Sequence, residues 1–246
     1  MSPITTDGYD RNAVLAAFPT HEIEKLEPHF RRVELRRELQ VYSPHEKISE
    51  VWFPLSGMIS LTAQLGSGAQ AEVGVVGREG VSGLPHYAGA RNLAFRAAVQ
   101  IPGEALVVDV DLILRAQERD PQVRQVLERA TSAFIALISQ TAACNRAHDV
   151  SQRLARWLLV SRDAAGEQAL ELTQEYLAMM IGVQRPTVTL AAGEFQRAGL
   201  IEYRRGKIRI RDAATLERTA CECYETVRNE YRRLLDQGQP RELVAV

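Results

Sequence analysis

The chain has 246 residues, of which 46% are hydrophobic and 25% are charged, and its formal net charge is −1. This composition is typical of a folded protein with room for two cores, and no stretch approaches the roughly 18 uninterrupted apolar residues of a membrane span. The three cysteines all lie after residue 143, which excludes a disulfide framework. We therefore expect a cytoplasmic protein that does not attach to a membrane.

Residues 1–119 predict an antiparallel barrel preceded by helices. Residues 12–30 have apolar positions at helical spacing, interrupted by Pro19. From Val33 to about Asp111, short segments rich in Val, Ile and Phe alternate with Gly and Pro, which is typical of strands separated by turns. The turn at residues 77–80 contains two glycines and would suit a phosphate, but no helix pattern follows it.

Residues 120–147 predict one long helix that begins at Asp120-Pro121. A heptad row of apolar or small residues runs along it: Val123, Leu127, Ala130, Phe134, Leu137, Thr141 and Cys144. A second row, on another face, contains Ala133, Ile135, Ile138 and Ala142. We expect one row to pack on the barrel and the other to pair two subunits of a homodimer; the alternative is a single core helix that is apolar on most sides.

Residues 148–246 predict a DNA-binding domain with a C-terminal helix. An amphipathic helix follows Asp149, and the stretch from Thr173 to Arg211 then has the pattern of a winged helix-turn-helix. Thr173 is the expected N-cap of the first helix, Gly182 the bend, and Pro186 a first-turn residue of the second helix. Two strands, 200–204 and 207–211, complete the pattern, and one face of a further helix carries Leu216, Ala220, Cys223, Val227, Tyr231 and Leu234.

Basic residues gather in this stretch. Residues 184–211 contain seven Arg or Lys residues and only two Glu, whereas the whole chain has a slightly negative net charge. Such a cluster neutralises phosphates and releases their counterions, so it favours double-stranded DNA as the partner. A basic hairpin that is merely solvated is the alternative, and the order of helix, turn, helix and wing favours DNA.

The chain resembles the Crp/Fnr family of transcription regulators over nearly its whole length. The resemblance is most specific in RLARWLL at residues 153–159, in LTQEYLAMMIGVQRPTV at 172–188 and in the exit to the wing at 199–201. It implies an α+β protein with a cyclic-nucleotide-binding-like jelly roll, a long dimerisation helix and a C-terminal winged helix. It also implies a homodimer that places the second helix of each helix-turn-helix in a major groove of a palindromic site.

The resemblance places Arg185 where many members contact the groove, and arginine there can bind guanine through two hydrogen bonds. This chain has Pro186 and Leu190 where the best-known branch has glutamate and arginine, so we expect a different half-site. The full set of DNA-binding candidates is Thr173, Gln184, Arg185, Thr187, Thr189, Arg204, Arg205 and Lys207.

The effector site departs further from the cyclic-nucleotide branches. Gly83 and Leu84 align with the Gly-Glu pair that holds the ribose, and Arg96, followed by Ala97, aligns with the phosphate-binding arginine. Leucine cannot accept the ribose hydrogen bonds, which argues against a cAMP-like ligand. Glu79 is a nearby carboxylate, and the identity of a small-molecule effector remains open.

The sequence predicts no metal site and no cofactor. The iron–sulfur branch needs cysteines near the barrel, and none precedes Cys144; the five histidines are scattered singly, which argues against haem. Cys221 and Cys223, if both lie on one helix, point about 200° apart and cannot share a metal. Cys144 lies on the expected dimer seam, where a buried structural thiol is favoured over a disulfide between subunits.

No carboxylate pair, nucleophile with a base, or phosphate loop supports catalysis, so we expect a regulator and not an enzyme. The rival interpretation is a ligand-sensing or protein-interaction module whose winged helix is a docking surface. An activator would in addition contact RNA polymerase through exposed loops, and the sequence identifies neither these loops nor the operator.

Overall fold

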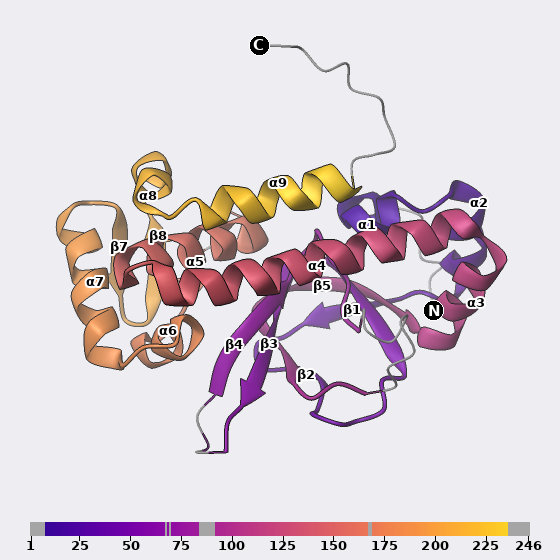
Figure 1. Cartoon of the computed structure of the whole chain (residues 1–246), viewed down its shortest axis with the longest axis horizontal. Helices are drawn as coiled ribbons and strands as arrows, with labels where there is room; N and C mark the ends of the chain where they lie inside the picture. The colour runs from indigo at the N-terminus through magenta and orange to yellow at the C-terminus, as the bar shows by residue number, and fades with distance from the viewer. Residues whose placement is uncertain (1–7, 67, 69, 84–91, 167–168, 236–246) are drawn as a thin grey trace, which may run out of the picture.

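The computed structural model describes residues 8–66, 68, 70–83, 92–166 and 169–235. Its N-terminal half is built on an antiparallel sheet and its C-terminal half on helices, which a long helix connects across the molecule (Figure 1). The strands of the larger sheet are β1 Arg31–Leu35, β2 Gln40–Tyr42, β3 Glu50–Gln64, β4 Gln70–Val76 and β5 Arg96–Asp109. They lie in the order β1-β5-β3-β4, and β2 also pairs with β5. No helix in the described part of the chain is long and apolar enough to cross a membrane.

β3 and β5 each join two segments that the sequence presents as separate strands. Glycine and proline interrupt the apolar runs at Pro54 to Gly57 and at Pro102-Gly103, but here the pairing shifts register and the strands continue. Gly57 and Gly103 lie against each other at the shift: a Cβ on Gly103 would stand 2.3 Å from the carbonyl oxygen of Ser56. Such bulges increase the local twist, so they allow two long strands to curve around a core.

Short helices close one end of the sheet. They are the 3₁₀ turns η1 Tyr9–Arg11 and η2 Glu27–His29 and the helices α1 Ala13–Ala16, α2 Thr20–Leu26 and α3 Val110–Arg119. Glu22 of α2 is fully buried, and it is compensated by hydrogen bonds from Arg119 and from Lys25, whose Nζ lies 2.7 Å away. The hydrogen bond from Arg119 holds the pKa of Glu22 at about 2, against the opposing effect of burial.

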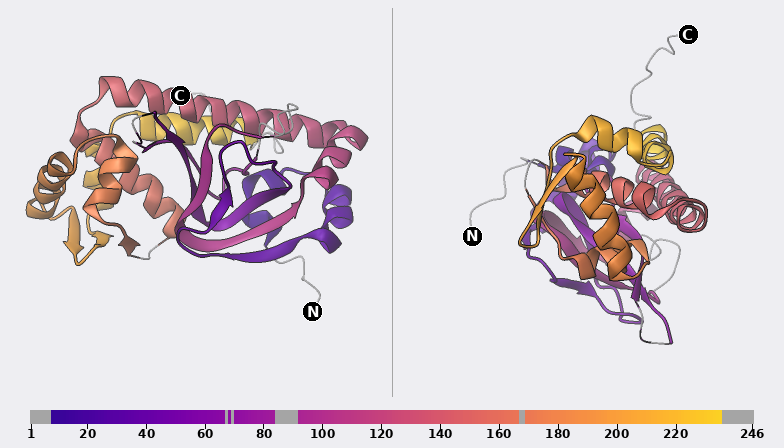
Figure 2. Two further views of the ribbon diagram at one scale, coloured as in Figure 1. Left: turned by 90° about the horizontal axis from the view of Figure 1, so that it is seen from below. Right: turned by 90° about the vertical axis from the view of Figure 1, so that its left-hand side faces the viewer.

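The long helix α4 Pro121–Ala147 runs along the sheet, with α9 Cys223–Leu235 beside it (Figure 2). Of the heptad row predicted for the dimer seam, Thr141 alone is not fully buried; the other six residues pack against the rest of the chain. The row that faces outward contains Ser132, Ile135, Ser139 and Ala142, with Ile135 57% exposed. The prediction that the first row and Cys144 lie on a free face is therefore wrong, because α9 and the sheet cover that face.

The remaining elements form the C-terminal region. They are α5 Val150–Ala165, β6 Leu170–Glu171, α6 Gln174–Ile181, α7 Arg185–Arg197, β7 Ile201–Arg204, β8 Lys207–Ile210, α8 Ala213–Thr219 and α9. One link of two residues, His148 and Asp149, connects α4 to α5, and Asp149 caps α5 in a capping box with Gln152. The single C-terminal helix that the apolar spacing predicts is two helices, because Ala220 is extended and ends α8.

Candidate functional site

The α6–α7 pair has the geometry of a helix-turn-helix. Thr173 caps α6 by accepting a hydrogen bond from the backbone of Tyr176 at 3.2 Å, as expected. Gly182 ends α6 in the left-handed conformation (φ 64°, ψ 44°), which few residues other than glycine adopt without strain. Gln184 is the N-cap residue of α7, and Pro186 stands in its first turn. The helix buries the predicted residues, Val188, Ala191, Ala192 and Phe195.

The opposite face of α7 points to solvent. Gln184, Arg185, Thr187 and Thr189 are all exposed, and Leu190 is 69% exposed. Arg185 pairs with Glu175 at 3.3 Å, and the Thr189 hydroxyl donates to Gln174 at 2.7 Å. Both partners belong to α6, so the first turn of α7 is held in place while its polar groups remain open to a partner.

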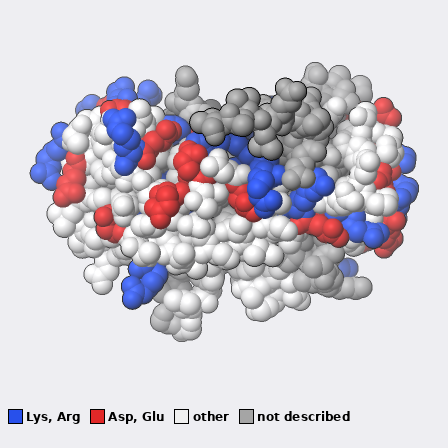
Figure 3. Space-filling model, turned by 45° about the horizontal axis from the view of Figure 1, so that its top comes forward, with Lys and Arg blue, Asp and Glu red and all other residues white. Residues whose placement is uncertain are grey.

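A three-stranded sheet lies next to this helix pair. β7 and β8 form the predicted hairpin, and β6 adds a third strand on β8. Arg205 (φ 51°) and Gly206 (φ 76°) make its two-residue turn, in which both residues have positive φ as a type I′ turn requires. Arg204, Arg205 and Lys207 are exposed, and Lys207 pairs with Glu171 at 2.6 Å. The surface around this end of the molecule carries charges of both signs (Figure 3).

The helix-turn-helix is attached to the barrel by polar contacts. The Trp157 indole of α5 donates to Glu72 of β4 at 3.0 Å, and the Ser60 hydroxyl of β3 donates to the same carboxylate at 2.7 Å. The Ser60 oxygen also lies 3.8 Å from the sulfur of Met180 in α6. Burial raises the pKa of Glu72 to about 7, and these hydrogen bonds limit the rise. One carboxyl that titrates near neutrality thus joins the two halves of the chain.

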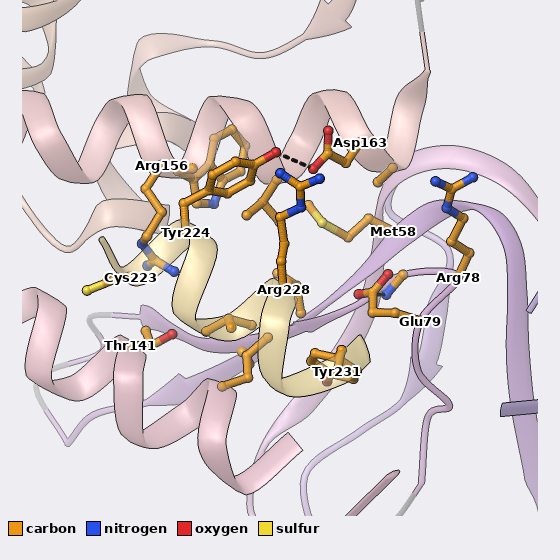
Figure 4. Close-up of a pocket in the computed structure, with 18 of the residues that line it drawn as sticks. Met58, Arg78, Glu79, Thr141, Arg156, Asp163, Cys223, Tyr224, Arg228 and Tyr231 are labelled. Carbon is orange, nitrogen blue, oxygen red and sulfur yellow. Dashed lines mark hydrogen bonds between the residues drawn. The ribbon is translucent and has the colours of Figure 1, made fainter. Parts of the chain in front are cut away.

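A cavity of about 340 Å³ opens beside this contact, between β4, α4, α5 and α9 (Figure 4). Charged and aromatic side chains line it: Glu72, Arg78, Glu79, Arg156, Trp157, Asp163, Tyr224, Arg228 and Tyr231. The Tyr224 hydroxyl donates to Asp163 at 2.6 Å, so α9 is bonded to α5 across the cavity. This volume lies in the range of small-molecule sites.

Among the effector candidates that the structure describes, Glu79 alone lines this cavity. Glu79 lines it, half-buried, with its carboxylate accepting from the backbone of Gly77 at 3.1 Å, and burial raises its pKa. Gly83 lies in a turn against Val51 and Ile48, and Leu84 lies outside the described residues. Arg96 and Ala97 begin β5 opposite β3 and do not line the cavity.

The part of the lining that comes from α5 and α9 was not predicted from the sequence. Trp157 and Arg156 lie within the RLARWLL segment, and Tyr231 was assigned to an apolar helix face. On the barrel side, Glu72 could have been recognised from the sequence as a candidate lining residue, because it is a carboxylate within the otherwise apolar strand AEVGVV. The other lining residues come together only because α9 packs back along α4.

The prediction that Cys221 and Cys223 diverge is wrong. Cys221 lies in the turn before α9, and only Cys223 belongs to the helix, so the two thiols are free to point to one place. Cys144 is a buried thiol, as favoured from the sequence, but its neighbour is Cys221 of the same chain, with the two Sγ atoms 3.5 Å apart.

Comparison with known proteins agrees with this geometry. The model of the Crp-like helix-turn-helix domain matches residues 152–219. The global nitrogen regulator of Nostoc sp. is 25% identical over 191 residues, which cover 74% of this chain and 86% of that protein. FixK2 from Bradyrhizobium japonicum has the same fold with a TM-score of 0.66 at 17% identity, covering 78% of this chain and 98% of that one. A transcriptional regulator of the CRP/FNR family from Thermus thermophilus has the same fold with a TM-score of 0.61 at 21% identity, covering 79% of this chain and 98% of that one. The chain thus contains a Crp-like helix-turn-helix domain and has the fold of CRP/FNR transcription regulators.

Proposed function

We propose that this transcription regulator binds palindromic DNA as a homodimer, with the exposed face of α7 in the major groove and the β7–β8 hairpin on the phosphates. The observation that supports this best is the position of Arg185 in the first turn of α7, exposed and oriented by Glu175. Side chains at the N-terminal end of a recognition helix reach base edges, and those of the wing reach the backbone. Regions 1–119, 120–147 and 148–246 then act as sensor, dimerisation helix and DNA-binding domain.

The DNA-binding candidates divide by position. Gln184, Arg185, Thr187 and Thr189 face outward from α7 and are assigned to the groove or its rim. Thr173 at the start of α6 and Arg204, Arg205 and Lys207 on the hairpin are assigned to phosphates. The exposed Leu190 is suited to a thymine methyl group, which a long polar side chain would not favour.

We assign the dimer contact to the outward row of α4. Ser132, Ile135, Ser139 and Ala142 follow one another at spacings of three and four residues, as in a coiled-coil seam, and none of them is charged. Small side chains along such a row allow two helices to approach closely.

Binding-site selection tests the proposal. The purified protein, without added ligand, is incubated with a random duplex pool at two salt concentrations, and bound sequences are read. Enrichment of a palindrome supports sequence reading by a dimer. Weak binding without a motif, lost steeply as salt rises, would instead favour an obligatory effector or a docking role for the winged helix.

Replacing Arg185 by alanine is expected to weaken binding to the selected palindrome about 10- to 100-fold, the loss of ~1–3 kcal/mol expected for a base-specific arginine. Binding to an unrelated duplex should change little. Fluorescence anisotropy with both duplexes measures the difference. Arg218→Ala, which removes an exposed arginine of α8, is the matched control; equal losses on both duplexes would contradict the base-reading role of Arg185.

Replacing Ile135 by glutamate is expected to halve the solution mass, because two charges would face each other across the seam. Sedimentation at several protein concentrations measures this, with circular dichroism to verify the helix content. The control is Leu65→Glu, which changes an apolar side chain of similar exposure, 56%, far from α4. A variant that remains dimeric would place the contact elsewhere.

We propose the cavity between β4, α5 and α9 as the effector site, in place of the Gly83–Ala97 segment. Its lining combines four arginines, Arg78, Arg156, Arg228 and Arg232, with aromatic rings, which suits a ligand that is both anionic and planar. Because the barrel and the DNA-binding domain both contribute to it, a bound ligand would bias their relative position. Contact with RNA polymerase remains a prediction.

A further inference from the structure

Three thiols and one imidazole converge where α4 ends. Cys144 lies in the last turn of α4, and His148 follows that helix. Cys221 lies in the turn between α8 and α9, and Cys223 is the first residue of α9. One ligand atom from each of the four lies within 4.8 Å of all the others. All three cysteines are buried, and the His148 side chain is 16% exposed.

The distances match those of a tetrahedral zinc site. Zinc bonds of about 2.3 Å to sulfur and about 2.0–2.1 Å to nitrogen place two sulfurs roughly 3.8 Å apart and a sulfur and a nitrogen roughly 3.6 Å apart. The Cys144 and Cys221 sulfurs are 3.5 Å apart, and the Cys223 sulfur is 3.5 Å from Nδ1 of His148. Both separations are within roughly 0.3 Å of these values.

The surrounding groups are also those of a metal site. Nε2 of His148 lies 3.2 Å from the carboxylate of Glu222, so Nδ1 is left as the ligand atom while the other nitrogen donates to a carboxylate, the usual arrangement for a metal-bound histidine. Gln140 donates to the Cys223 sulfur at 3.0 Å.

We propose that Cys144, His148, Cys221 and Cys223 bind one zinc ion in a closed, structural Cys₃His site. Three thiolates select a soft divalent cation, and a fully protein-supplied set of four ligands leaves no position for a substrate. The ion would fasten the link between α4 and α5 to the start of α9. Three thiolates and Zn²⁺ have a net charge of −1, which the buried Arg153 and the partly buried Arg156 would offset.

A disulfide is the competing interpretation of the same atoms. It would join Cys144 to Cys221 but would not account for the nearby Cys223 thiol, or for the His148 ring that Glu222 orients toward it. A second group of possible ligands, His21, Glu22 and Asp120, is less suited to a metal because Arg119 and Lys25 already occupy Glu22. The zinc site and the disulfide predict different outcomes in the same experiment.

The test is metal analysis of the full-length protein, produced with zinc in the medium and purified anaerobically under reducing conditions without chelators. We expect about one zinc per chain, released when a mercurial reagent has modified three thiols. Cys144→Ser and His148→Gln should reduce the zinc content to near zero or bind it far more weakly, whereas His21→Gln should leave it unchanged. These results together would support the site.

Cobalt decides the question even if a variant fails to fold. Wild-type protein freed of zinc and given Co²⁺ should develop the thiolate charge-transfer band and the intense visible absorption of tetrahedral cobalt, and added zinc should abolish both. Wild-type protein that contains no zinc and gives no such spectrum with three titratable thiols would overturn the proposal. So would a Cys144–Cys221 disulfide in the protein purified under these reducing conditions.

Discussion

A Gly103→Ala substitution is expected to lower the free energy of unfolding by about 3 kcal/mol or more, at or beyond the upper end for overpacking. The added methyl group would stand 2.3 Å from the Ser56 carbonyl oxygen and 2.6 Å from the Gly57 nitrogen. These are backbone atoms of a paired strand, so they cannot rotate away as a flexible side chain does. Relief would require β3 and β5 to separate at the bend on which the curvature of the sheet depends.

Thermal unfolding followed by circular dichroism and calorimetry measures the effect, with a midpoint about 10 °C or more below wild type expected for the barrel. Gly193→Ala is the matched control, because a methyl group at that α7 position meets nothing within 4 Å. That variant should be unchanged or more stable by about 0.5–1 kcal/mol, since alanine favours a helix. Similar midpoints for both variants would contradict the rigid contact at the bend.

Replacing Glu72 by glutamine is expected to stabilise the protein at pH 8 and to have little effect near pH 4.5. Burial raises the pKa of Glu72 to about 7 in the folded chain, above its usual value of 4.5. Between these two values the folded state holds a proton that the unfolded chain releases, so wild-type stability falls as pH rises. Glutamine carries no charge to bury. Its amide oxygen can accept from the Trp157 indole, and its NH2 group can donate to the Ser60 hydroxyl, which also accepts.

The free energy of unfolding of the variant should therefore exceed that of wild type by an amount that grows from pH 4.5 to 7 and then stays constant, reaching at most about 3 kcal/mol. Unfolding midpoints over pH 4.5–8.5 measure it. The exposed Glu24 gives the control, Glu24→Gln, for which we expect no such trend. A difference that is independent of pH would show that the Glu72 carboxyl is ionised throughout and solvated in the folded state.

Local signals were enough to predict the helix-turn-helix. Thr173 starts α6, Gly182 ends it and Pro186 stands in the first turn of α7, and each of these effects involves only residues close in sequence. The spacing of the apolar residues in α7 determines which face of that helix is buried. The position of Leu190 on the open face follows from the same spacing. These features depend on residues close in sequence, which is why the structure and the prediction agree there.

Features that depend on distant contacts were predicted poorly. Pro54, Gly57 and Gly103 look like strand ends in sequence, but each strand continues because its partner bends at the same place. The free face of α4 was misjudged because only the packing of α9 shows which row is covered. The thiol cluster was missed for the same reason, together with the break between α8 and α9 that removes Cys221 from the helix.

The link of two residues between α4 and α5 limits how the two halves can move. Asp149 caps α5, and His148 lies 3.5 Å from the Cys223 sulfur at the start of α9, so a change in the angle between α4 and α5 would have to be made at these two residues. A rotation displaces each atom in proportion to its distance from the pivot, and α7 lies at the far end of the molecule (Figure 1). In the proposed dimer a small turn at the pivot therefore becomes a change in the spacing of the two recognition helices, which DNA requires to match its helical repeat of about 34 Å.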